Sequence, residues 1–462
     1  MTFSKKTTGA PSELSTISEA SGNSFRSDLI QTTQFNLVAA LIGLCTGIMA
    51  SRFLGPHGRG ELAAIQNIPV LIATIGTLGL PDAVVYFIAR NKHEAKEYLA
   101  SALVLGSLLL AVFCTGAFLA MPRLLAAQSP QVVGAARLYL VICLVMLFAG
   151  LPVQALRAVG NMRAWNVLRM LTPVLWLLLL GFAFLLNHKN AGDKDAIWLS
   201  RGNLVLQAFL VICVLIAVNT RLRGAWLPSR SLWPPMLSYG VFSVGTTIPQ
   251  VLNIRLDQLM MAAILPPRDL GLYVVAVAWS NSVFPFTVAV SGVLFPKVAS
   301  LSGREEQIIW LSRGTRLGAL LACTAVLLVL PLTPLVLPFL FGRDFRESVP
   351  VALLLVVATA IAALNGVIED GLRGLGAPKL ALLAEVAGLA VTIAALLMLL
   401  KHWGIMGAGW ASLAGYSSTF LVLTIGLWQT TKAPFLSFIV PSRSDARMLF
   451  AHFTRFLGRR TG

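Results

Sequence analysis

Long apolar runs alternate along most of the chain with short polar segments that contain glycine, proline, lysine and arginine. A helix that crosses a membrane needs about 20 mostly apolar residues. Twelve runs meet this requirement: 29–51, 62–88, 98–120, 134–156, 166–187, 196–219, 236–264, 271–296, 314–340, 349–371, 380–400 and 405–429. The pattern therefore predicts an all-α membrane protein of about twelve spans, whose connections are too short to hold a soluble domain.

Two short motifs occur twice at nearly the same distance, which indicates that the chain consists of two similar halves. Residues 155–169 match residues 371–385 at an offset of 216, and both contain Leu-Arg-x-x-Gly-x-x-Arg/Lys. Residues 53–63 match residues 264–274 at an offset of 211. The alternative is that membrane proteins often have basic, glycine-containing loops on the cytoplasmic side. Because six spans per half is an even number, duplication predicts parallel repeats.

The positions of Lys and Arg predict which side of the membrane each connection faces. With the N-terminus inside, 24 of the 36 basic residues fall in cytoplasmic segments, in agreement with the positive-inside rule. We therefore expect both termini in the cytoplasm. The predicted organisation is a flexible cytoplasmic tail (1–28), a six-helix lobe (29–220), an inter-lobe loop (221–235), a second six-helix lobe (236–430) and a basic cytoplasmic tail (431–462).

The composition supports a membrane protein and argues against several classes of function. Charged residues make up 12% of the chain, against about 25% in soluble domains. The net charge of +17 is spread between the apolar runs, so it fits membrane topology better than a nucleic-acid partner. The five cysteines and five histidines have no metal-ligand spacing, and no nucleotide-binding motif is present. We expect no metal, no cofactor and no catalytic residues, and hence no enzyme.

The seventh predicted span carries the clearest functional pattern, because six polar residues recur at steps of three or four. They are Tyr239, Ser243, Thr246, Gln250, Asn253 and Asp257. Such steps place all six on one face of a helix. A polar face along a whole span indicates either a water-filled cavity or a helix–helix seam held by hydrogen bonds. The cavity interpretation makes Gln250 and Asn253 candidate substrate-binding residues and Asp257 a candidate ion-coupling residue.

Arg255 flanks this stripe but points about 200° away from Asp257, so it must reach round or pair with another helix. It is a candidate for binding a pyrophosphate, and Arg52 at the end of the first span is a second one. Asp82, which follows Gly79-Leu80-Pro81, is a further candidate ion-coupling residue.

Asp370 and its neighbour Glu369 lie at the end of the tenth predicted span, close to Arg373. Two interpretations are open: the two acids bind a proton or cation, or Arg373 neutralises them at the membrane interface. On the first interpretation Asp370 is the third candidate ion-coupling residue. The two copies of the repeat also differ in charge here, because Gln154 corresponds to Asp370 and Arg169 to Glu385. The second half is thus not a passive copy of the first.

Five segments taken together resemble bacterial oligosaccharide flippases: RFLGPHGRGELAAI (52–65), LGLPDAVVYFIAR (78–90), LRAVGNMRAWN (156–166), FGRDF (341–345) and LRGLGAPKL (372–380). Their order is similar to that in Wzx-type polysaccharide transporters of the multidrug/oligosaccharidyl-lipid/polysaccharide superfamily, over nearly all of residues 29–430. The resemblance implies two six-helix lobes around a central cavity. Related lipid II flippases typically have fourteen spans, two more than expected here.

The resemblance also implies a substrate and a location. Members move an undecaprenyl-pyrophosphate-linked oligosaccharide across the bacterial inner membrane by alternating access, often with ion coupling, to supply O-antigen, capsule or exopolysaccharide synthesis. The implied partners are this lipid-linked oligosaccharide, membrane lipids, and a polysaccharide polymerase or chain-length protein.

Two other functions remain open on the sequence: a multidrug or cation antiporter of the same fold, and a membrane scaffold. The abundant basic residues favour a substrate with phosphate, since Arg pairs well with phosphate. An antiporter of cationic drugs is expected to have several acids in the cavity of its first lobe. Asp82 is the only acid that clearly lies deep within a predicted span of that lobe.

Overall fold

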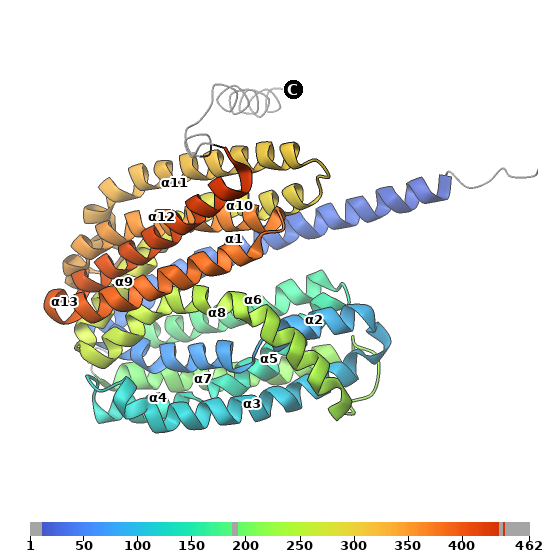
Figure 1. Ribbon diagram of the computed structural model, residues 1–462. Helices are drawn as coiled ribbons and strands as arrows, with labels where there is room; N and C mark the ends of the chain where they lie inside the picture. Colours follow the sequence, from blue (N-terminus) through green and yellow to red (C-terminus); the bar gives the residue numbers. More distant parts are fainter. Residues whose placement is uncertain (1–11, 187–192, 434–437, 439–462) are drawn as a thin grey trace, which may run out of the picture.

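The computed structural model describes residues 12–186, 193–433 and 438, and every regular element within them is helical (Figure 1). The first half forms α1 (Ser12–Gly76), α2 (Leu80–Arg90), α3 (Ala95–Leu124), α4 (Pro130–Tyr139), α5 (Ile142–Ala158), α6 (Met162–Leu185) and α7 (Asp193–Asn219). The second half forms α8 (Trp233–Ile264), α9 (Pro267–Ser280), α10 (Phe284–Ala299), α11 (Arg304–Phe341), α12 (Val349–Gly374) and α13 (Pro378–Thr431). The connections contain short 3-10 turns: η1 (Lys92–Glu94), η2 (Arg230–Leu232), η3 (Asn281–Val283) and η4 (Arg343–Ser348).

The predicted number of spans is recovered once two long helices are divided at their kinks. Nine stretches of the described residues are long and apolar enough to cross a membrane. α1 and α13 each contain one non-helical glycine, Gly55 (φ 66°) and Gly404 (φ 52°), in a conformation that side chains rarely adopt. α8 is not among the nine, because its polar residues lower its hydropathy. Counted with α8 and with both parts of α1 and α13, the described helices give the twelve predicted spans and confirm the all-α polytopic fold.

Both copies of the longer repeat form the same turn between two helices. Gly160 follows α5 with φ 90°, and its equivalent Gly376 follows α12 with φ 78°. The next residues donate equivalent backbone hydrogen bonds of 2.9 Å, from Asn161 N to Leu156 O and from Ala377 N to Leu372 O. A left-handed glycine after the last helical turn lets the chain reverse while it pairs the free carbonyls. This shared backbone geometry supports an origin by duplication.

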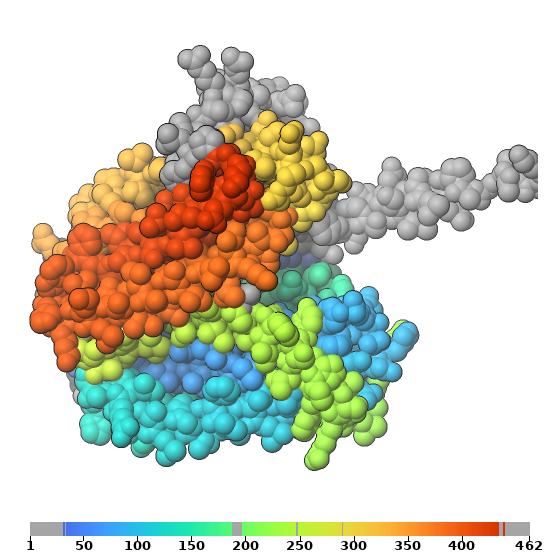
Figure 2. Space-filling model, in the orientation of Figure 1, coloured from blue at the N-terminus to red at the C-terminus, as the bar shows by residue number. Residues whose placement is uncertain are grey.

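The helices of each half pack mainly against one another and form two groups. α5 packs against α2, α3 and α7 in the first half, and its repeat equivalent α12 packs against α10, α11 and α13 in the second. Figure 2 shows the blue-to-green helices of the first half below and the yellow-to-red helices of the second half above. α8 lies between the two groups and contacts α1, α2 and α3 as well as α13. It is therefore placed to line the interface between the lobes.

The predicted tails fall largely outside the described residues. α1 already begins at Ser12, so residues 12–28 are helical where a flexible tail was expected. Residues 1–11 lie outside the described residues, and so does nearly all of the basic segment 431–462, in which Thr431 is the last residue of α13.

The most extensive contact between the two halves joins α1 to α9. A Cβ atom added to Gly60 would overlap the carbonyl of Pro267, and one added to Gly271 would overlap the carbonyl of Pro56. The shorter repeat aligns Gly60 with Gly271, so each copy touches the other, as expected near an approximate two-fold axis between the lobes. Only glycine permits this approach of two backbones.

We expect Gly271→Ala to destabilise the purified protein, because the added methyl group forces α9 away from α1. Overpacking of this kind costs roughly 1–3 kcal/mol of the free energy of unfolding. The matched control is Gly134→Ala in α4, where a Cβ meets nothing within 4 Å. Thermal melting in detergent checks the prediction, and equal melting temperatures for the two variants would contradict it.

Candidate functional site

The polar stripe of α8 divides between the two lobes. Near the start of the helix, Ser243 donates a hydrogen bond to the Asp82 carboxylate in the first turn of α2. The Tyr239 ring of α8 stacks on the Tyr86 ring of α2, with ring centroids 4.3 Å apart. This part of the stripe is a seam between the lobes. The structure thus places Asp82 in an inter-lobe contact, outside the two cavities described next.

The later part of the stripe faces a small pocket inside the second lobe. The pocket has a volume of about 80 Å³ and lies between α8, α9, α12 and α13. Its polar lining residues include Gln250, Asn253, Asp257, Asn365, Glu385 and Tyr416. We call it the second-lobe pocket. Both interpretations of the stripe therefore hold, each for one part of α8.

Asp257 lies in this pocket with only 3% of its surface exposed. It accepts hydrogen bonds from the Tyr273 hydroxyl (2.6 Å) and from the backbone N–H of Gln258 (2.7 Å). Tyr273 Oη also lies 3.2 Å from Ser412 Oγ. Within the described part of the chain, Asp257 forms no ion pair. An acid buried in a membrane protein without a basic partner is costly and is typical of a proton or ion site.

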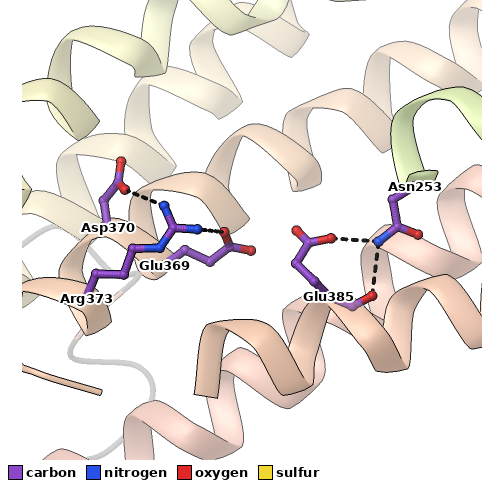
Figure 3. Close-up of polar contacts among 5 residues, drawn as sticks. All are labelled: Asn253, Glu369, Asp370, Arg373 and Glu385. Carbon is purple, nitrogen blue, oxygen red and sulfur yellow. Dashed lines mark hydrogen bonds and ion pairs between the residues drawn. The ribbon is translucent and has the colours of Figure 1, made fainter. Parts of the chain in front are cut away.

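Glu385, which also lines the pocket, lies close to a further acid, Glu369 (Figure 3). Asn253 Nδ2 donates to Glu385 Oε2 at 2.6 Å and to the Glu385 carbonyl at 3.1 Å. The carboxyl groups of Glu369 and Glu385 point toward one another, and both residues are buried. Two negative charges repel strongly in a low-dielectric environment. A proton or a cation between these acids would remove the repulsion.

Several acceptor atoms near these acids lack a donor. They are the buried oxygens Asn253 Oδ1, Asn365 Oδ1 and Glu369 Oε1. Buried acceptors usually find a partner, so their grouping favours a bound proton donor or cation. In the described residues, no group of three or more His, Cys, Asp or Glu side chains is arranged so that it could hold a metal ion. The oxygen-rich pocket consequently fits a proton or a hard, weakly held cation better than a transition metal.

The remaining predicted site residues occupy other positions. Asp370 pairs with Arg373 (3.4 Å), which also contacts Glu369 (3.5 Å), so the expected neutralisation by arginine is present (Figure 3). Arg255 reaches round to α1, where its Nη1 lies 3.4 Å from Asn67 Oδ1. It thus sits at the lobe interface beside the stripe, as the helix geometry predicted.

Arg52 is the clearest difference from the expectation. Its guanidinium donates to the carbonyls of Phe339 and Leu340, with Nε 2.7 Å from Leu340 O. These carbonyls belong to the last turn of α11, where helix C-terminal oxygens lack partners of their own. Arg52 therefore links the two halves and lines neither cavity.

The sequence interpretation did not include Glu385, Tyr273, Asn365 or Tyr416 among the site residues. Glu385 alone had a signal, because it replaces Arg169 of the first half at an otherwise similar position. The others are single polar residues in apolar runs, and they become recognisable only when packing places them beside Asp257.

A larger cavity lies inside the first lobe, between α1, α4, α5, α6 and α7. Its volume is about 610 Å³. The polar residues that line it are Gln66, Tyr139, Gln154, Arg169, Asn203 and Gln207, and two tryptophans, Trp165 and Trp176, add aromatic surface. We call it the first-lobe cavity. Its described lining contains one arginine and no carboxylate, whereas the second-lobe pocket contains two carboxylates and no basic side chain.

The described residues form two groups of helices, each with a cavity that polar side chains help to line, and together they make up a multi-pass membrane protein. The chain belongs to the polysaccharide biosynthesis protein family, whose model matches residues 26–302. It is 23% identical over 377 residues to the probable low-salt glycan biosynthesis flippase Agl15 of Haloferax volcanii, covering 79% of this chain and 76% of that protein. The chain is therefore a member of a polysaccharide biosynthesis family that is similar in sequence to a probable glycan flippase.

Two solved structures have the same fold. The lipid II flippase MurJ in an inward closed conformation superposes with a TM-score of 0.73 at 14% identity, covering 92% of this chain and 93% of that one. An inward-facing multidrug resistance MATE family transporter superposes with a TM-score of 0.63 at 15% identity, covering 86% and 96%. These two neighbours show that the chain has the fold of membrane transporters.

Proposed function

We propose that the protein moves an undecaprenyl-pyrophosphate-linked oligosaccharide across the bacterial inner membrane for the synthesis of a cell-surface polysaccharide such as O-antigen, capsule or exopolysaccharide. The observation that carries this proposal is the opposite charge of the two cavities. A basic cavity in one lobe suits an anionic glycan carrier, and an acidic pocket in the other suits a coupling proton or cation. A polysaccharide polymerase or chain-length protein would then receive the product.

Ion coupling is assigned to the second-lobe pocket. Asp257 is the central candidate, and Glu385, Gln250 and Asn253 line the same space. Asp82 and Asp370, the other candidates from sequence, belong to an inter-lobe contact and to an arginine pair. We therefore give these two a supporting role.

Alternating access requires the lobes to separate first on one side and then on the other. The lobes touch through α1 and α9 near Gly60 and Gly271, and also through α2 and α8, where Gly79 and Gly240 are in backbone contact. In the topology proposed from the Lys and Arg pattern, with both termini cytoplasmic, the first contact lies toward the outside and the second toward the cytoplasm. Arg255, which contacts Asn67 at the interface between them, is our candidate for binding the pyrophosphate.

Purified protein in liposomes tests this function. We expect it to speed the exposure of an undecaprenyl-pyrophosphate-linked oligosaccharide to a probe outside the vesicles, and an imposed proton or sodium gradient to change the rate. The control is liposomes prepared in the same way without protein.

A multidrug antiporter is the second candidate, because the MATE transporter shares the fold. Export of cationic dyes without any effect on the lipid-linked oligosaccharide would establish it and reject the flippase. The first-lobe cavity argues against this outcome, since the arginine in its lining repels cations.

A further inference from the structure

We propose that the first-lobe cavity binds the sugar part of the carried lipid, and that Arg169 pairs there with an oxyanion attached to the glycan. The inference rests on the proposed flippase function and adds to it the place and the chemistry of headgroup recognition. The oxyanion is either the carboxylate of an acidic sugar or the pyrophosphate next to the first sugar.

The first argument is the position of Arg169. Its guanidinium stacks 4.1 Å from the centre of the Trp165 ring, and its Nη2 donates to Asn36 Oδ1 at 2.6 Å. Its Nε is buried and has no hydrogen-bond partner among the described residues. Asn36 and Trp165 thus fix the plane of the guanidinium while leaving donors free, which is how arginine is prepared for bidentate pairing with a carboxylate or phosphate.

The second argument is the charge around Trp165. The Arg157 guanidinium also lies over this ring, 5.4 Å from its centre. Two cations beside one ring repel each other, and the described lining of the cavity has no carboxylate to compensate them. An anionic ligand would remove this repulsion.

The third argument is the kind of polar group that accompanies Arg169. Gln154 Oε1 and Asn203 Oδ1 are buried acceptors without a donor, although Asn203 Nδ2 donates to Tyr139 Oη at 2.6 Å. Hydroxyl groups of a sugar are suitable donors for both. The faces of Trp165 and Trp176 offer flat apolar surface for the C–H face of a sugar ring. Although most of the lining is apolar, these amides, aromatic faces and one arginine give the cavity the groups that an acidic glycan requires.

The repeat provides a matched comparison. Arg169 and Gln154 of the first lobe correspond to Glu385 and Asp370 of the second, at the offset of 216. Arg169 and Glu385 each line the cavity of their own lobe. One duplicated position has therefore become basic where the larger cavity lies and acidic where the small pocket lies, which separates glycan binding from ion binding.

A cysteine-protection experiment tests the proposal. Gly150 lines the cavity, is exposed, and would place a Cβ where nothing lies within 4 Å. Gly150→Cys, in the full chain with its five native cysteines replaced by alanine, is labelled with a water-soluble maleimide in detergent. The probes are cellobiouronic acid, cellobiose, which differs only in lacking the carboxylate, and farnesyl pyrophosphate. The control is Gly366→Cys, the repeat equivalent in the second lobe, where a Cβ also meets nothing within 4 Å.

We expect cellobiouronic acid or farnesyl pyrophosphate to slow labelling of Gly150→Cys at concentrations about tenfold lower than cellobiose requires, since a charge-assisted hydrogen bond is worth about a factor of ten. Protection by cellobiouronic acid would identify the oxyanion as the sugar carboxylate, and protection by farnesyl pyrophosphate would identify it as the pyrophosphate. Arg169→Gln should abolish this difference, Arg169→Lys should keep part of it, and Gly366→Cys should show no protection.

Equal protection by cellobiouronic acid and cellobiose, unchanged by Arg169→Gln and with no effect of farnesyl pyrophosphate, would overturn the proposal. So would protection by phospholipid alone, which would make the cavity a lipid site. Calorimetric titration of the native-sequence protein with the same probes gives the same test if the cysteine variant does not fold. If binding fails while lipid-linked oligosaccharide still crosses the liposome membrane, this inference is wrong and the flippase function stands.

Discussion

Asp257→Asn is expected to reduce transport by about a hundredfold, while membrane insertion stays normal. This factor lies near the upper end of the effects that coupling between two sites produces. Asparagine has nearly the same shape and keeps one acceptor oxygen, for the Tyr273 hydroxyl or for the backbone N–H of Gln258, so one of the two hydrogen bonds is lost. It cannot take up a proton or neutralise a cation. Because Asp257 is buried without an ion pair, loss of its charge costs the fold little and can even stabilise it.

The measurement is gradient-driven transport of the lipid-linked oligosaccharide in liposomes, together with expression level and melting temperature. Asp344→Asn is the matched control, since Asp344 is an exposed acid in η4, outside both cavities. Full activity of Asp257→Asn would mean that the later part of the α8 stripe, which faces the second-lobe pocket, only packs helices together.

A covalent link across the lobe interface is expected to stop transport completely and reversibly. In the described structure Ser243 of α8 and Asp82 of α2 are hydrogen bonded, so cysteines at both positions lie within reach of each other or of a short bifunctional methanethiosulfonate reagent. The link holds the two lobes together on one side, which alternating access cannot tolerate. Reduction with dithiothreitol should restore the rate to that of the unlinked double variant.

The control is a link inside one lobe, between cysteines at Arg268 and Glu347. These residues form an ion pair of 2.7 Å between α9 and η4, both in the second half of the chain. Cross-linking them should leave transport nearly unchanged, since a rigid lobe keeps its shape. Transport that survives the link between positions 82 and 243 would show that the lobes do not separate there.

Packing over long distances in the sequence decided how the α8 stripe is used. The step of three and four residues placed Tyr239, Ser243, Gln250, Asn253 and Asp257 on one face, because helical geometry is local. It could not tell that the same face meets α2 of one lobe near its start and the pocket of the other lobe farther along. The cavity and the seam were treated as alternatives, and the structure contains both.

The arginines illustrate the same limit. For Arg255 the angle from Asp257 correctly excluded a shared face and required a partner on another helix, which the structure supplies in Asn67. For Arg52 the sequence offered only a charge at the end of a span. Its partners are backbone carbonyls that lie 287 and 288 residues farther along the chain. Every residue has a backbone carbonyl, so the sequence does not mark which carbonyls an arginine will contact.

The sequence by itself determined the membrane-spanning helices and their approximate number, and it predicted the duplication. Each follows from local chemistry: apolar length, glycine with positive φ, and residues that recur at a fixed offset. Only the tertiary structure decided which polar residues share a space. Glu369, Glu385 and Asn365 join Asp257 because α8, α12 and α13 converge in the second lobe, and Arg169 joins Gln154 and Asn203 because α5, α6 and α7 converge in the first. A helix fixes the face on which a residue lies, but the helix that meets this face depends on how all the spans pack together.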